Sequence, residues 1–125
     1  MAAIASAAFI LFISPWSASA KPRHVIGGHF IALAVAIPLA LLANPDSVGW
    51  AGTSPFLFAV YAAVGVSASM FLMAATDTKH PPAASTALAL IGHGFSWDLL
   101  IFVATAVLIM VGIHQSLRRH FADLY

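Results

Sequence analysis

The residues that could do chemistry in this chain gather in two short polar segments, and the more informative is Lys79-His80-Pro81-Pro82. This segment separates two apolar stretches. Proline is favoured at the first positions of a helix, because its missing N–H would have no partner there. We therefore predict a helix that begins at Pro81, with free N–H groups and the positive end of its dipole beside Lys79 and His80. This combination is typical of an anion site.

His80 is the strongest candidate ligand in this segment. Because it precedes two prolines, its backbone is restricted, and we expect its imidazole to lie over the helix start. An imidazole at a helix mouth packs little, so a His80→Ala change should leave the fold nearly intact. The alternative is an exposed loop histidine. Ser85 and Thr86 follow in the first helical turns, where their hydroxyls donate either to the same ligand or back to helix carbonyls.

The second polar segment, Lys21 to His29, also couples basic residues and a proline to a helix start. Gly27 and Gly28 let another backbone or a ligand approach closely. We interpret it as a second wall of the same anion path, with Arg23 as attractor and His29 as a polar gate. In the alternative, the basic residues only orient the chain and His29 is a packing residue. Titratable groups at membrane depth are costly and usually face a cavity or partner, which favours function for His29.

Ten residues are predicted to bind the anion: Arg23, Gly27, Gly28, His29, Lys79, His80, Pro81, Pro82, Ser85 and Thr86.

The remaining polar residues indicate no further site. His93 and Asp98 lie about 140° apart around a helix and converge only if the intervening glycines bend the chain. We interpret the stretch between them as an interfacial turn. Four residues near the C-terminus are expected at the membrane surface, where cations at helix ends extend to the interface: His114, Arg118, Arg119 and His120.

Enzyme signatures are missing from the sequence. It has no His-Glu-x-x-His, no Gly-x-Ser-x-Gly and no glutamate. We expect no catalysis, no cofactor and no metal. A weaker alternative is an intramembrane enzyme or metal site built from His29, His80, His93 and Asp98.

Composition places the protein in a membrane. The chain has 125 residues, of which 62% are hydrophobic and only 7% charged, whereas soluble domains carry about 25% charged residues. Its mean hydropathy is +0.98. A net charge of +1 gives no reason to expect a nucleic-acid partner. Because the chain has no cysteine, the sequence does not indicate a redox compartment. We predict one domain over residues 1–125.

We predict an all-α integral membrane bundle of four to five short transmembrane helices or half-helices with proline-headed starts. Residues 25–43 and 55–75 are clear spans, close to the ~20 residues that cross a bilayer. Leu99 to Ile113 reaches that length with its flanking residues. The apolar pieces Ala2 to Ser14 and Ala83 to Gly92 are too short to cross without recruiting polar neighbours.

Charge placement favours one topology. The basic residues Lys21, Arg23, Lys79, Arg118 and Arg119 suit a single, cytoplasmic side, and the loop around Asp46 suits the other. This requires residues 83–95 to form a short crossing and residues 99–113 to return. A re-entrant half-helix at residues 83–92 is the alternative, and it would move the C-terminus to the other side.

The N-terminal segment has two interpretations. Ala18-Ser19-Ala20 has the form of a signal-peptidase site, but the preceding residues carry no Lys or Arg. Against cleavage stands a weak internal repeat, in which residues 6–12 resemble residues 67–73 and each stretch is followed by a lysine and a proline. Transporters often contain such repeats.

The two polar segments together resemble the HPP family of integral membrane proteins, named for the tripeptide seen here at residues 80–82. The resemblance covers about residues 5–113. It implies a small, usually four-spanning helical protein, some of whose plant and cyanobacterial relatives are linked to nitrite transport. Family members generally have more apolar sequence upstream, so this chain is expected either to be a shortened version or to begin at a misassigned start. His24 stands where many relatives have asparagine, and Ser85 where many have glycine.

The combined expectation is a permease or channel-like protein of a bacterial inner membrane that moves a small inorganic anion, nitrite first. Passive flux and proton-linked flux through His29 or His80 both stay open. The alternative is a non-transporting membrane subunit that packs against a partner protein. Small residues are frequent in every segment and permit close helix contact, so we expect a homo-oligomer.

Overall fold

The computed structural model describes residues 2–43 and 54–121, and all regular structure within these ranges is helical. The elements are α1 (Ala2–Ile13), the 3₁₀ turn η1 (Ala18–Ala20), α2 (Pro22–Ala43), α3 (Pro55–Ala75), α4 (Pro81–His93) and α5 (Trp97–Phe121). Three of them, α2, α3 and α5, contain stretches long and apolar enough to cross a membrane. The predicted helical membrane bundle is confirmed, with α2, α3 and α4 each beginning at a proline.

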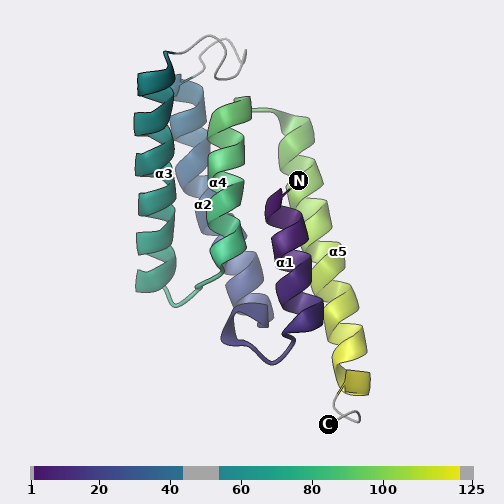
Figure 1. The fold of residues 1–125 in the computed structure, drawn as a ribbon. Helices are drawn as coiled ribbons and strands as arrows, with labels where there is room; N and C mark the ends of the chain where they lie inside the picture. The colour runs from purple at the N-terminus through teal and green to yellow at the C-terminus, as the bar shows by residue number, and fades with distance from the viewer. Residues whose placement is uncertain (1, 44–53, 122–125) are drawn as a thin grey trace.

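The helices form two hairpins and a returning helix (Figure 1). In the α1–α2 and α3–α4 hairpins the first helix runs toward one end of the bundle and the second runs back, and α5 then returns to the end where α2 and α4 begin. α2 packs against both α3 and α4. Its buried face is a row of alanines four residues apart, Ala32, Ala36 and Ala40, each 0% exposed. Such small residues let neighbouring helices approach closely.

The turn between α3 and α4 is set by backbone hydrogen bonds. Asp77 follows the C-cap with a φ of 52°, in the left-handed region that Asp tolerates better than most residues. The N–H of Thr78 donates to the carbonyl of Met73 at 2.9 Å, and the N–H of Asp77 donates to Ala74 at 3.4 Å. These two bonds form a Schellman motif, which ends α3 abruptly. Only three residues then separate Asp77 from the first residue of α4.

α4 begins at the same end of the bundle as α2 and runs toward the opposite end (Figure 1). Its 13 residues cover about 20 Å at 1.5 Å per residue, and its C-terminus lies at the other end of the bundle from the start of α2 (Figure 1). Gly94 ends the helix with a φ of 79°, a conformation that favours glycine. The chain then enters α5, which runs back. α4 and α5 thus have the directions that the one-sided arrangement of basic residues requires.

The prediction of an exposed His114 is wrong. The side chain is 1% exposed. It lies three and four residues after Val111 and Met110 and seven after Val107, and all three belong to a buried cluster with residues of α1 and α2. Residues at these spacings share one face of a helix, so His114 extends the buried face of α5.

We expect residues 21, 79 and 118 to face one side of the membrane and residue 46, which lies outside the described residues, to face the other. Single cysteines at these positions, labelled with an impermeant maleimide in intact cells or spheroplasts, test this. Labelling of positions 118 and 46 from the same side would establish the re-entrant alternative and contradict the crossing by α4.

Candidate functional site

The two polar segments predicted from the sequence meet where α2 and α4 begin, and they are joined by reciprocal hydrogen bonds. Nδ1 of His80 lies 2.9 Å from the carbonyl oxygen of Ser19 in the α1–α2 connection. Nδ1 of His24 lies 3.3 Å from the carbonyl oxygen of Lys79 in the α3–α4 connection. Because a carbonyl only accepts, both Nδ1 atoms must carry the proton in these bonds. Each connection thus supplies a histidine donor to the backbone of the other.

The glycine pair allows this junction to close. A Cβ atom on Gly28 would lie 2.8 Å from Cβ of His80 and 3.1 Å from the carbonyl oxygen of Thr78, and one on Gly27 would lie 2.7 Å from the Thr78 methyl group. Real Cβ atoms essentially never come within 3.0 Å of another residue's atoms, so a side chain at either glycine would force residues 78–80 to shift. The predicted close approach therefore exists, but residues 78–80 occupy the space that a ligand would need. The glycines are packing residues of the junction.

Two histidines lie side by side in the interior. His80 is 0% exposed and His29 is 3% exposed, and their ring centroids are 5.3 Å apart. Nδ1 of His29 is 3.1 Å from the hydroxyl of Thr86 on α4. Nε2 of each ring is buried and has no hydrogen-bond partner among the described residues. We call His29 and His80 the histidine pair.

The environment of His80 disfavours its charged form. Burial lowers the pKa of its imidazole, the hydrogen bond to the Ser19 carbonyl raises that pKa in part, and nearby His24 lowers it. The main cause of the lowered pKa is that the protonated ring would lose its water on burial, with no carboxylate beside it to compensate. His80 is thus held neutral, with its proton on Nδ1.

The start of α4 differs from the prediction in two ways. The His80 side chain does not cap the helix, although His80 is the N-cap residue. The expected free N–H groups are also missing at the first three positions, because Pro81 and Pro82 have none and that of Ala83 donates to the His80 carbonyl at 2.9 Å. Because prolines have no N–H, the first turn of α4 leaves no backbone donor without a partner at these three positions. Any anion at this point must take its hydrogen bonds from side chains.

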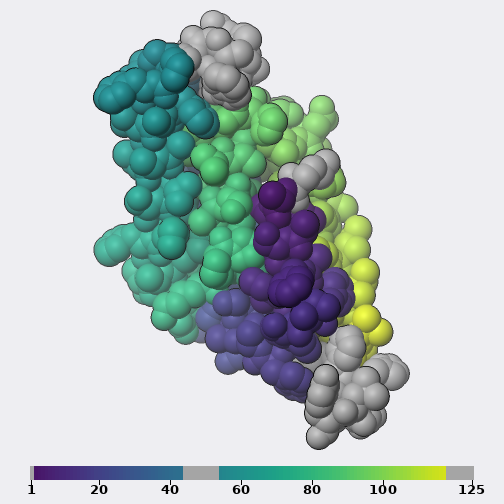
Figure 2. Space-filling view, in the orientation of Figure 1, coloured from purple at the N-terminus to yellow at the C-terminus, as the bar shows by residue number. Residues whose placement is uncertain are grey.

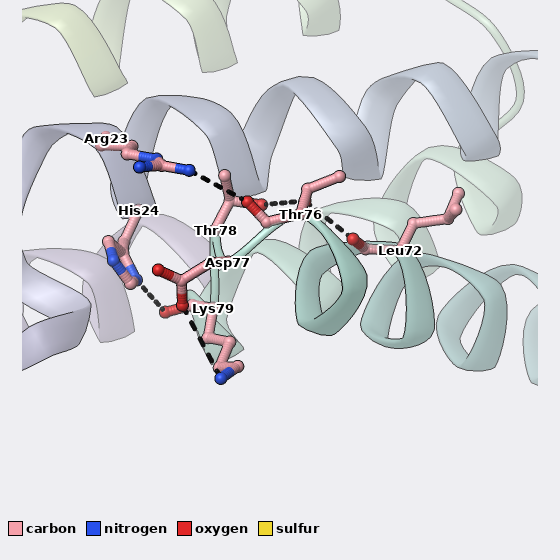
Figure 3. A network of polar contacts seen from close by, with 7 residues as sticks. All are labelled: Arg23, His24, Leu72, Thr76, Asp77, Thr78 and Lys79. Carbon is pink, nitrogen blue, oxygen red and sulfur yellow. Dashed lines mark hydrogen bonds and ion pairs between the residues drawn. The ribbon is translucent and has the colours of Figure 1, made fainter.

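The predicted basic residues lie at the surface and not in the pair. Nζ of Lys79 is 3.7 Å from a carboxylate oxygen of Asp77, and both side chains are more than half exposed. Arg23 is exposed and donates to the carbonyl of Thr76 at 3.3 Å. Figure 3 shows both basic residues around the turn that follows α3. They place positive charge on the surface at this end of the bundle.

The remaining predicted residues face different spaces. Pro81, Pro82 and Ser85 line an open groove against α1, whose Ser6 is the other polar side chain in it. The boundary of α1 and α4 that contains this groove faces the viewer in Figure 2. Thr86 lies on the inner side of α4, where it also lines an otherwise apolar cavity of about 20 Å³ between α1, α2, α4 and α5. That volume suffices for about one water molecule.

The alternative metal site is not assembled. His93 is the last residue of α4 and Asp98 lies in the first turn of α5, about 20 Å along the bundle from the histidine pair. No group of three or more potential metal ligands occurs within residues 2–43 and 54–117, whose side chains the structure describes.

Sequence reasoning missed the contacts that hold the pair in place. The Ser19 carbonyl and His24 were not among the predicted site residues, and backbone carbonyls leave no trace in a sequence. One feature of the sequence could have indicated His24, because this residue lies between the basic pair Lys21 and Arg23 and the glycine pair that follows. Nothing local to it indicated Lys79 as its partner.

The fold and its apolar helices define a small helical membrane protein. The chain belongs to the HPP family, because the family's transmembrane region matches residues 1–120. A curated transmembrane protein of Dictyostelium discoideum is 34% identical over 107 residues, which make up 83% of this chain and 34% of the relative. The chain therefore spans about a third of the length of that relative. No solved structure matches it.

We expect His80→Ala to destabilise the protein by about 1–3 kcal/mol, because it leaves a void and an unpaired Ser19 carbonyl. The premise of an imidazole that packs little at a helix mouth is wrong, because His80 is fully buried, so the expectation of a nearly intact fold is replaced. His80→Asn should cost less, because its side-chain amide reaches the position of Nδ1 and can still donate to Ser19. Thermal unfolding in detergent measures both.

Lys79→Gln is the control for that comparison. It removes an exposed ion pair, which is worth at most about 1 kcal/mol. Equal losses of stability for His80→Ala and Lys79→Gln would contradict the structural role assigned to the junction.

Proposed function

We propose that this protein is a membrane permease for a small monovalent inorganic anion, nitrite first, that it catalyses no reaction, and that it works in a bacterial inner membrane. The observation that carries the proposal is the histidine pair, two buried rings whose Nε2 atoms lack hydrogen-bond partners. Buried polar atoms are nearly always paired, so an unpaired one calls for a functional explanation. A transient ligand of the two rings supplies that explanation.

The surroundings of the pair favour a negative ligand. The N-termini of α2 and α4 meet there, and each contributes a partial positive charge. Lys21, Arg23 and Lys79 are exposed at the same end and attract anions toward it. The only described carboxylate at this end, Asp77, is exposed and paired with Lys79.

A path through the pair requires movement. The pair is closed from solvent, and the cavity beyond Thr86 is too small for a polyatomic anion. The groove at Pro82 marks the side from which the start of α4 is reached, because Pro82 follows His80 by two residues. We propose that α1 moves away from α4 to expose the pair, because the groove between them is lined by apolar residues apart from two serines.

Protein-dependent anion uptake into liposomes tests the proposal directly. We expect nitrite to enter vesicles that contain the purified protein faster than protein-free vesicles, and His80→Asn to reduce this flux at least tenfold, because it removes the Nε2 atom and retains the bond to Ser19. His93→Ala is the matched control, since His93 is an exposed histidine at the other end of α4.

A panel of nitrite, nitrate, formate and chloride separates class from substrate. Flux of another anion alone would replace nitrite and keep the class. Inert protein with every anion would favour the alternative, a non-transporting subunit that packs against a partner protein.

We also propose that the protein works as a homo-oligomer. Many large apolar side chains of α3 and α5 are exposed, among them Phe56, Phe71 and Ile101, and small residues lie between them. Lipid covers such a face as well as protein does, so the exposed side chains alone do not favour an oligomer. The proposal is supported by the small size of the bundle, which is too small to enclose a wide path. Native mass measurement in nanodiscs should give a dimer or trimer, and a monomer would remove this proposal.

A further inference from the structure

The hydrogen bonds of the histidine pair determine where a proton can bind. Nδ1 of His80 bonds to the Ser19 carbonyl at 2.9 Å. A neutral imidazole has one N–H, and this bond assigns it to Nδ1. Nε2 of neutral His80 therefore holds a lone pair. A lone pair repels an anion, so neutral His80 cannot bind one through this atom.

Protonation changes Nε2 from an acceptor to a donor. The resulting imidazolium offers an N–H and a positive charge to the same space, while the Ser19 bond continues unchanged. Without an anion this form is unfavourable, because the ring is 0% exposed and the charge has lost its water. An anion at Nε2 removes that penalty. The proton and the anion thus stabilise each other in the site.

No neighbouring described group can take the place of the anion beside a charged His80, or of His80 as the binding site for the proton. On α2, His24 donates from Nδ1 to Lys79, and His29 contacts the ring of His80. On α4, Thr86 is neutral, and in the connections Lys79 is exposed and paired with Asp77. α1 carries no Asp, Glu, Lys, Arg or His, Lys21 follows η1 at the surface, and α5 has the buried His114 near the same end. No described carboxylate touches the pair.

The pair accommodates one proton at a time. Two imidazolium rings with centroids 5.3 Å apart would repel each other in an environment of low dielectric constant. The hydroxyl of Thr86 can either donate to or accept from Nδ1 of His29, so His29 can present an N–H or a lone pair to the shared space without becoming charged.

We propose that the histidine pair binds one proton together with one anion, so that the protein carries the two across the membrane as a neutral unit. This inference rests on the proposed function and adds its coupling ion. The proton comes from water on the side of entry, is held on Nε2 of His80, and is released with the anion on the other side. No net charge crosses the membrane in a cycle.

The test uses vesicles that contain the full chain, a pH-sensitive dye in the lumen and an inward anion gradient. We expect lumen acidification in step with anion entry, at one proton per anion, and a rate that does not change when potassium and valinomycin impose a membrane potential. Flux should fall about tenfold per pH unit above the pKa of the pair, since the protonated fraction falls at that rate. Nitrous acid crosses bare lipid, so protein-free vesicles are subtracted and nitrate is run in parallel.

Protein-dependent entry without lumen acidification, at a rate set by the membrane potential, would overturn the coupling and leave the permease standing. Absence of protein-dependent flux for every anion would remove the permease and the coupling together. The two failures are therefore distinguishable.

A pair of matched variants locates the proton. His80→Asn and His24→Asn both retain a side-chain amide toward a backbone carbonyl and both lose an Nε2 atom. We expect a flux loss of at least tenfold for His80→Asn and an unchanged ratio of protons to anions for His24→Asn. One proton per anion with wild-type pH dependence in His80→Asn would show that the proton is carried elsewhere and would contradict the proposal.

Discussion

The rest of the structure depends on the cross-bonding of the two interhelical connections. His80 reaches back to the carbonyl of Ser19, and His24 reaches forward to the carbonyl of Lys79. These bonds tie the α1–α2 hairpin to the α3–α4 hairpin at the end where α2 and α4 begin. They require the backbones to approach closely, which Gly28 permits because a side chain there would collide with His80. The alanine face of α2 continues the same close contact along the bundle.

This constraint also decides the chemistry. A histidine that must bond to Ser19 through Nδ1 loses its tautomeric freedom, and its burial next to His29 leaves Nε2 as an isolated polar atom. The prolines after His80 contribute by satisfying the helix start, so backbone amides do not compete for a ligand. The tripeptide at residues 80–82 thus combines an architectural role, through its prolines and Nδ1, with a chemical one, through Nε2. The architectural role follows from the contacts, and the chemical role is a proposal.

Much of the architecture could be predicted locally. The lengths of the apolar stretches predicted the three spanning helices, and the start of α2 at Pro22 and of α4 at Pro81 followed from the preference of proline for the first helical turn. The meeting of the two polar segments was also predicted, because each one couples basic residues and a proline to a helix start. The expected weak packing of His80 was wrong because its ring bonds to Ser19, which is distant in sequence. His114 was placed at the surface because its charge and position near a helix end suggested it, although its spacing from Val107 and Val111 predicted the buried face.

By itself the sequence determined the class of protein, the family, the helix starts and the residue types available to a site, because composition, length and proline position act locally. The tertiary structure decided which of those residues form the site. It separated Lys79 and Arg23, which lie at the surface, from His29 and His80, which are buried together, and it fixed the tautomer of His80. The physical reason is that hydrogen bonds between residues 61 positions apart, as between Ser19 and His80, depend on how the helices pack, and a backbone carbonyl is identical in every residue type.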